Sequence, residues 1–156
     1  MSATTSKVAV LVGSGHKVAL VALPVAVVGL AANLEYPELF DVGGPPALLA
    51  AFAAVVLGAG LVIWAWSAAL ILVKVPRGER ITTGPYALVR HPLYVGVALL
   101  VLPAAGLLLD SWLGLAIGAA LYAGSRTFAQ EEEAELTRTF GPAWGRYRDS
   151  VLLPWL

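Results

Sequence analysis

The chain has 156 residues, of which 59% are hydrophobic and only 13% are charged, and its mean hydropathy is +0.81. This composition excludes a soluble globular protein, and the length allows one domain, too small for a soluble catalytic domain joined to a membrane anchor. Ten basic and ten acidic residues cancel, with no basic stripe that would indicate nucleic-acid binding. The absence of cysteine excludes disulfides and thiolate chemistry, and we expect no metal site.

Four apolar segments predict four membrane-spanning helices, at residues 17–34, 47–73, 92–109 and 112–128. Because about 20 helical residues cross the hydrocarbon core, the second segment is long enough by itself and the other three need residues from their flanks. The first segment follows Lys7 and Lys17 and so also resembles a secretory signal, but we treat it as retained. We therefore expect an all-α polytopic membrane protein, a single membrane domain over residues 1–156, with an amphipathic helical tail at the carboxyl end.

All ten Lys and Arg residues fall on one side of these spans. They precede the first span, lie in the loop 74–92, or follow from Arg126 onward, whereas the opposite loops carry only the acidic residues Glu35, Glu38, Asp41 and Asp110. The positive-inside rule then predicts that both termini and the loop 74–92 are cytoplasmic. The bias toward Ala, Gly, Val and Leu suggests a bacterial origin, and hence the inner (cytoplasmic) membrane.

The third and fourth spans are joined only by Asp110 and Ser111, so they must form an antiparallel hairpin whose cytoplasmic ends lie side by side. This hairpin brings two polar segments together, residues 82–96 before the third span and residues 126–156 after the fourth. Gly114 and Gly118 on the fourth span let another helix approach closely, either within the bundle or across a homodimer.

The first polar segment begins with a turn at Gly84-Pro85 and places Pro92 in the first turn of a helix, where its missing N–H costs nothing. Four polar and aromatic residues gather around this helix amino terminus: Tyr86, Arg90, His91 and Tyr94. The exposed donors and the dipole of a helix amino terminus favour anions such as a carboxylate.

The second polar segment continues the fourth helix and changes sharply from apolar to charged residues. Leu136 and Phe140 mark an apolar stripe, and Glu132 shares that face by its i, i+4 spacing to Leu136. A carboxylate turned inward near a membrane needs a partner or a ligand. After Gly141-Pro142, the residues Trp144, Tyr147, Val151, Leu152 and Trp155 are typical of a short amphipathic helix in the membrane interface.

Together, the two segments resemble the isoprenylcysteine carboxyl methyltransferase and phospholipid methyltransferase superfamily of integral membrane enzymes. The resemblance covers Thr82 to Leu156, and its matching elements are Gly84-Pro85-Tyr86, Arg90-His91-Pro92, Tyr94, Gly96, Glu132-Glu133, Leu136, Phe140-Gly141, Trp144, Tyr147 and Pro154. Two features depart from the family pattern. Trp144 stands where a tyrosine is common, and the amino-terminal half has only two spans, which leaves the substrate open.

The resemblance implies an S-adenosylmethionine-dependent methyltransferase whose cofactor binds at the cytoplasmic ends of the last spans. Five residues of the first segment would line the pocket: Tyr86, Arg90, His91, Tyr94 and Gly96. Glu132 and Glu133 would close it from the carboxyl-terminal segment. The acceptor would be a lipid-like or isoprenoid molecule dissolved in the membrane.

A carboxylate acceptor is favoured, because opposite charges are lost as the methyl moves from a sulfonium, and a dry site of low dielectric favours that transition state. Arg126, on the last turn of the fourth span, is the residue we expect to position the acceptor. Its alternative role is that of an ordinary arginine that extends from the membrane edge to water.

Two other functions remain open from the residues alone. A sterol-reductase-like protein that uses NADPH would be expected to have more spans and additional basic residues for the extra phosphate. A non-catalytic membrane scaffold or a small permease would explain the four spans and the Gly114/Gly118 pair, but it gives no reason for two cytoplasmic clusters.

Overall fold

The computed structural model describes residues 15–79 and 81–153. Its long helices are α2 (Gly15–Glu35), α3 (Ala47–Lys74) and α7 (Leu113–Phe140). Between α3 and α7, one continuous helical segment consists of α5 (Pro92–Gly96), the π-helical turn η3 (Val97–Val101) and α6 (Leu102–Leu108). The short elements are η1 (Pro37–Leu39), η2 (Val75–Arg77), α4 (Pro85–Leu88) and α8 (Pro142–Ser150).

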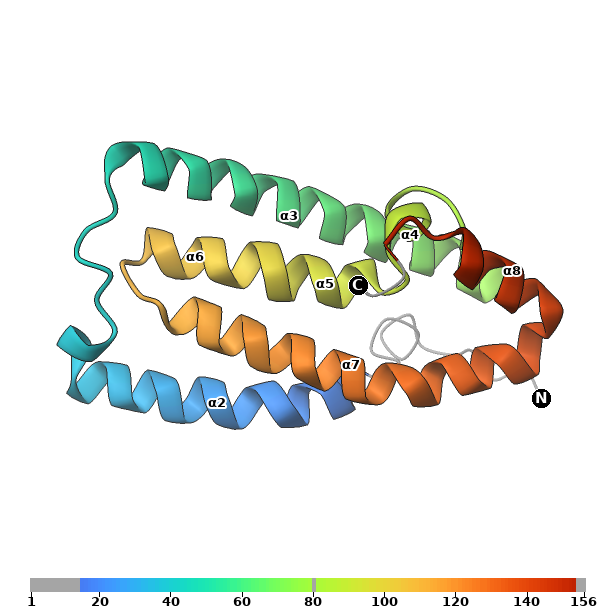
Figure 1. The fold of residues 1–156 in the computed structure, drawn as a ribbon, viewed down its shortest axis with the longest axis horizontal. Helices are drawn as coiled ribbons and strands as arrows, with labels where there is room; N and C mark the ends of the chain where they lie inside the picture. The colour runs from blue at the N-terminus through green and yellow to red at the C-terminus, as the bar shows by residue number, and fades with distance from the viewer. Residues whose placement is uncertain (1–14, 80, 154–156) are drawn as a thin grey trace.

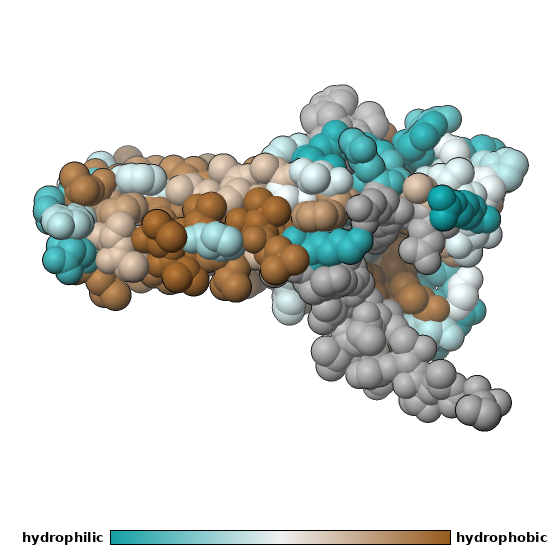
Figure 2. Space-filling view, turned by 90° about the horizontal axis from the view of Figure 1, so that it is seen from below, coloured by the Kyte–Doolittle hydropathy of each residue, from teal (hydrophilic) through white to brown (hydrophobic). Residues whose placement is uncertain are grey.

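The long segments lie side by side in the order α3, α5–α6, α7, α2 (Figure 1). The first apolar segment of the chain is therefore next to the last one, and α2 packs chiefly on α7. On the face shown in Figure 2, hydrophobic residues cover most of the length of the bundle, and hydrophilic residues gather mainly at the end that carries α8, with a smaller group at the opposite tip. Large apolar side chains such as Leu20, Leu48 and Val55 are exposed on α2 and α3, as expected for helices that face lipid.

Among residues 15–79 and 81–153, two helices have the length and hydropathy of a membrane crossing. They are Lys17–Glu35, with 19 residues and a mean hydropathy of 2.0, and Ala47–Arg77, with 31 residues and a mean hydropathy of 2.5. These helices agree with the first two expected spans. The third expected span forms a shorter apolar helix, Pro92–Leu108, and the fourth forms the first part of α7. The count of four spans and the cytoplasmic placement of both termini stay predictions.

Glycines bring the third segment and α7 into close contact. Gly114 lies against Gly106 of α6, and Gly118 lies against the carbonyl oxygen of Ala98, so a Cβ at either position on α7 would overlap backbone atoms. Of the two uses that the sequence left open for Gly114 and Gly118, the structure shows packing within the bundle. The same chain covers both glycines, and a homodimer formed through them would have to displace this contact.

The third segment departs from a regular α-helix at η3. Pro103 has no N–H to donate to the carbonyl of Leu99, and the helix widens into the π-helical turn just before this proline. Gly60 of α3 packs against η3, where a Cβ would lie only 2.9 Å from Cβ of Leu100. The close approach of α3 fixes the third segment from the side opposite α7.

The end of the bundle remote from α8 is tied together by its loops. The indole N–H of Trp112 donates to the carbonyl oxygen of Leu39 at 2.7 Å, and its ring stacks on Phe40 with 4.8 Å between centroids. A hollow of about 400 Å³ opens at this end, and its lining residues are Asn33, Pro37, Glu38, Asp41, Leu109, Asp110 and Ser111. The hollow is at the opposite end of the bundle from α4 and α8 (Figure 1).

Candidate functional site

The helix α7 is continuous from the fourth apolar segment into the second polar segment. It runs for 28 residues from Leu113 to Phe140 without a break. Its buried side includes Gly118, Ser125 and Ala129, and Glu133 continues this side one turn further on. The position of Glu133 is therefore set by the packing of α7 on the third segment.

The first polar segment folds back over the end of α3 before the third segment begins. Gly84 has a positive φ of 65° and lies against Trp66, at whose ring a Cβ would come within 3.1 Å. This left-handed turn leads into α4, and the chain is extended again at Val89. His91 is at the N-cap position of α5 without a capping hydrogen bond from its side chain, and Pro92 is buried in the first turn, as the sequence predicts. Arg90 and His91 thus lie at the start of the third segment.

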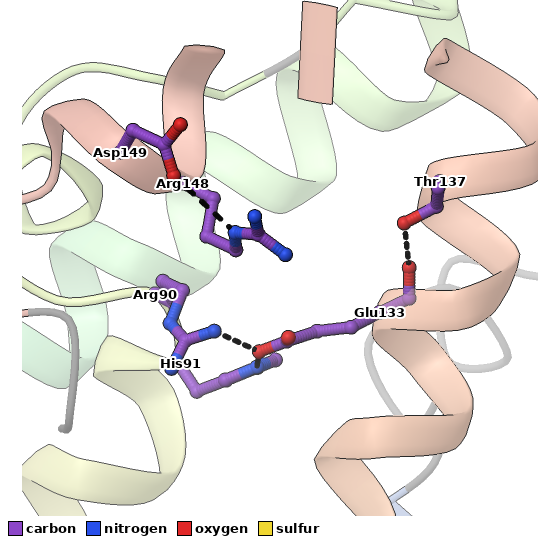
Figure 3. A network of polar contacts seen from close by, with 6 residues as sticks. All are labelled: Arg90, His91, Glu133, Thr137, Arg148 and Asp149. Carbon is purple, nitrogen blue, oxygen red and sulfur yellow. Dashed lines mark hydrogen bonds and ion pairs between the residues drawn. The ribbon is translucent and has the colours of Figure 1, made fainter. Parts of the chain in front are cut away.

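Arg90, His91 and Glu133 form a charged bridge between the two polar segments (Figure 3). Nη1 of Arg90 donates to Oε1 of Glu133 at 2.6 Å, and Nε2 of His91 lies 3.4 Å from the same oxygen. The side chains of Arg90 and His91 are 11% exposed and that of Glu133 is 21% exposed. The bridge joins residues 42 and 43 positions apart along the chain, as the hairpin argument requires.

The surroundings hold the Glu133 carboxyl in its ionised form. The hydrogen bond with His91 and then the positive charge of Arg90 lower the pKa of Glu133 from its ordinary value, against the opposing effect of burial. The positive charge of Arg126 also lowers the pKa of Glu133. Arg126 lies two helical turns from Glu133 toward the apolar part of α7, and its side chain is exposed. At neutral pH the bridge is therefore an ion pair.

The cap, which consists of α8 and residues 151–153, closes over α4. The hydroxyl of Tyr147 donates to the carbonyl oxygen of Tyr86 at 2.7 Å, and the N–H of Leu153 donates to the carbonyl oxygen of Leu88 at 2.9 Å. Burial raises the pKa of Tyr147 to about 12, so its hydroxyl stays protonated and can donate. Gly141, with a φ of 55°, makes the turn from α7 into the cap.

The apolar face of α8 is turned toward the protein. Trp144, Tyr147 and Val151 are buried, and the half-buried Leu136 and Phe140 of α7 pack against them. The expected amphipathic helix is present, and Trp144 and Tyr147 face the protein because the extension of α7 covers them. The position of α8 in the membrane interface stays a prediction. Leu152 is exposed, and Trp155 lies outside the described residues.

The other predicted residues of the first segment lie around the bridge. Tyr94 is half-buried, and its ring centroid is 6.4 Å from that of His91. Tyr86 is half-buried on α4 and offers its carbonyl oxygen to the cap. Gly96 is buried against α3, where a Cβ would be 3.6 Å from Cγ2 of Ile63. Gly96 thus lets α3 and α5 approach each other.

The structure describes the side chain of one of the two predicted glutamates of α7. The structure brings Glu133 to the bridge, whereas the side chain of Glu132 lies outside the described residues. The spacing of Glu132 to Leu136 by itself predicts that Glu132 faces inward. Had the stripe been extended from the membrane part of the helix through Ser125 and Ala129, the i, i+4 step would have pointed to Glu133.

The sequence gives little indication of the hydrogen bond between the Tyr147 hydroxyl and the Tyr86 carbonyl oxygen. Tyr147 belongs to the matched pattern, but its partner is a main-chain oxygen, which no residue type reveals. Trp144 also belongs to the pattern, and its buried indole N–H has no hydrogen-bond partner within the part of the chain that the structure describes.

Fold and site together define a helical membrane protein with a charged bridge and a folded cap at one end of its bundle. Residues 48–138 match the model of the isoprenylcysteine carboxyl methyltransferase (ICMT) family. This match covers more than half of the chain, from α3 to the α7 extension, and includes Arg90, His91 and Glu133. The protein belongs to this family, which confirms the predicted resemblance and supports a membrane methyltransferase. No curated relative and no solved structure matches the chain.

Proposed function

We propose that the protein transfers a methyl group from S-adenosylmethionine to a lipid-like or isoprenoid acceptor dissolved in the membrane, with a carboxylate as the favoured acceptor group. The observation that carries this proposal is the charged bridge at the end of the hairpin. It gathers two donors and one carboxylate just outside the apolar spans, beside the aromatic ring of Tyr94. These groups suit a ligand that carries an ammonium, a carboxylate and a nucleoside.

The residues of the bridge would hold the amino-acid end of the cofactor. Arg90 and His91 are donors for its carboxylate, and Glu133 is an acceptor for its ammonium or for ribose hydroxyls. In the same proposal, Tyr86 and Tyr94 flank the nucleoside, and Glu132 and Gly96 belong to the pocket wall. When bound, the cofactor supplies an electrophilic methyl group on a positively charged sulfur.

The protein's own contribution is alignment and the exclusion of water. The cap is hydrogen-bonded to α4 and packed on α7, so it closes the site from the cytoplasmic side of the proposed topology. Well-oriented reactants gain about 7 to 11 kcal/mol from such positioning. A carboxylate acceptor has no proton to lose, and the loss of opposite charges favours a site of low dielectric. For an amine acceptor, His91 or a glutamate would serve as base.

Arg126 is proposed to position the acceptor. Its side chain is exposed on α7, two helical turns from Glu133 toward the membrane. An acceptor that arrives sideways from the bilayer would meet this guanidinium before it meets the bridge, and a guanidinium binds a carboxylate or a phosphate well. The proposed location is the inner membrane of a bacterium, with the site on the cytoplasmic side.

Calorimetric titration of the purified protein in detergent tests this function. We expect micromolar binding of S-adenosylmethionine and of its demethylated product, and no comparable affinity for NADPH. The variant His91→Ala should lose most of this affinity while its thermal unfolding stays cooperative. If neither sulfur compound gives a heat of binding, the methyltransferase proposal is refuted. A positive titration leads to a screen of candidate lipids with a labelled methyl donor.

A further inference from the structure

We propose that Glu133 is an exchangeable internal ligand of Arg90 and His91. An α-amino-acid head group would insert between them, its carboxylate taking the place of the Glu133 carboxylate and its ammonium binding to the Glu133 side chain that it displaces. This inference rests on the proposed function, because the amino-acid head group in question is that of the cofactor. It adds a specific exchange of partners, which the proposed function does not require.

The geometry of the bridge suits such an exchange. Both donors share one oxygen of Glu133, with the Arg90 contact at 2.6 Å and the His91 contact at 3.4 Å. An incoming carboxylate can offer one oxygen to each donor, so that Arg90 and His91 no longer share a single acceptor atom. The side chain of Glu133 is also the most exposed of the three, at 21% against 11% for each donor. The glutamate is therefore the member of the bridge that a ligand reaches first.

The helix can stay in place while this exchange occurs. The backbone of Glu133 is held within α7, where its carbonyl oxygen also accepts a hydrogen bond from the Thr137 hydroxyl at 2.7 Å. A glutamate side chain has three rotatable bonds, so its carboxylate can swing away from Arg90 without a shift of the helix. Nearer the membrane, Gly118 keeps α7 packed on the third segment throughout.

The charges balance before and after the exchange. The bridge contains the positive guanidinium of Arg90 and the negative carboxylate of Glu133, and an amino-acid head group carries one charge of each sign. Insertion of the head group replaces one ion pair by two, so that Arg90 and Glu133 both keep a partner of opposite charge. An unpaired charge at this degree of burial would be costly. A nucleoside without an amino-acid end could bind beside the bridge and leave it closed.

Three ligands that differ only at the amino-acid end test this inference. S-adenosylhomocysteine carries the ammonium and the carboxylate, its deamino analogue carries only the carboxylate, and methylthioadenosine carries neither. We expect the wild-type protein to prefer S-adenosylhomocysteine to the deamino analogue by about tenfold, the size of one charge-assisted hydrogen bond. In Glu133→Gln this preference should disappear. Methylthioadenosine measures the part of the affinity that does not come from the amino-acid end. The control Glu38→Gln, an exposed glutamate at the far end of the bundle, should keep the preference.

The outcomes separate this inference from the proposed function. If Glu133→Gln keeps the wild-type preference for the ammonium, the exchange is refuted and the methyltransferase proposal stands. If the wild-type protein binds none of the three ligands, both proposals fail. Should Glu133→Gln not fold, Arg90→Gln gives the mirror test, in which the preference for S-adenosylhomocysteine over its decarboxylated analogue must fall, because only His91 is left as a donor for the carboxylate. A preserved preference in that variant overturns the inference.

Discussion

Two glycines on α3 provide a sharp test of how the third segment is held. Gly60 is buried against η3, and a Cβ there would lie 2.9 Å from Cβ of Leu100 and 3.3 Å from the backbone nitrogen of Val101, inside the 3.4 Å at which ordinary contact begins. Gly58, half a turn away on the same helix, is exposed and would meet nothing within 4 Å. The same substitution therefore has opposite consequences at the two positions.

We expect Gly60→Ala to lower the free energy of unfolding by about 1 to 3 kcal/mol, because an added methyl group in a well-packed contact forces backbone shifts. Gly58→Ala should be neutral or should stabilise by up to about 1 kcal/mol, since alanine loses less backbone entropy in a helix. Both variants are compared with the wild type by thermal unfolding in the same detergent. Equal transition temperatures for the two variants would contradict the close approach of α3 to η3.

The remaining predictions concern the cap and the charged bridge. Tyr147→Phe should destabilise the cap by about 0.5 to 1.5 kcal/mol, because the carbonyl of Tyr86 loses its donor, and faster proteolytic cleavage after residue 140 would report this. Because the folded-state pKa of Glu133 lies below its ordinary value of 4.5, its contribution to stability is present above about pH 4.5 and is lost as the pH falls through the folded-state pKa. The transition temperature of Glu133→Gln should therefore depend less on pH in the acid range than that of the wild type, and identical profiles would rule out this bridge. In a labelled-methyl assay, Arg126→Ala should raise KM for an anionic acceptor by about tenfold while the cofactor affinity stays unchanged. Arg126→Lys should restore part of this loss. An unaltered KM in Arg126→Ala would show that Arg126 does not belong to the acceptor site.

Much of the architecture follows from features that act locally along the chain. Apolar segments of membrane length predict the long helices, and the linker of Asp110 and Ser111 predicts the hairpin that brings Arg90 to α7. Pro92 predicts the start of the third segment, which begins at this residue. These inferences succeed because chain connectivity and helix geometry leave few alternatives.

The features that the sequence did not reveal depend on contacts between distant surfaces. The packing of α2 on α7 joins two apolar helices that carry no complementary pattern of charge. The π-helical turn η3 arises next to Pro103 but has no residue signature of its own. The inward position of Glu133 depends on the rotation of α7 about its axis, to which the contacts of Gly114 and Gly118 with the third segment contribute.

The neighbour relationship of α2 and α7 has a consequence for biosynthesis. A ribosome makes α2 before the three other long segments, yet the helix on which α2 chiefly packs is the last of them to emerge. Insertion into the bilayer can proceed one segment at a time, but the α2–α7 contact can form only after the part of α7 that meets α2, such as Gly124 beside Val18 and Val21, has been made. Until then the lipid bilayer must solvate the flank of α2 that later rests on α7, and the nascent protein stays open on that side.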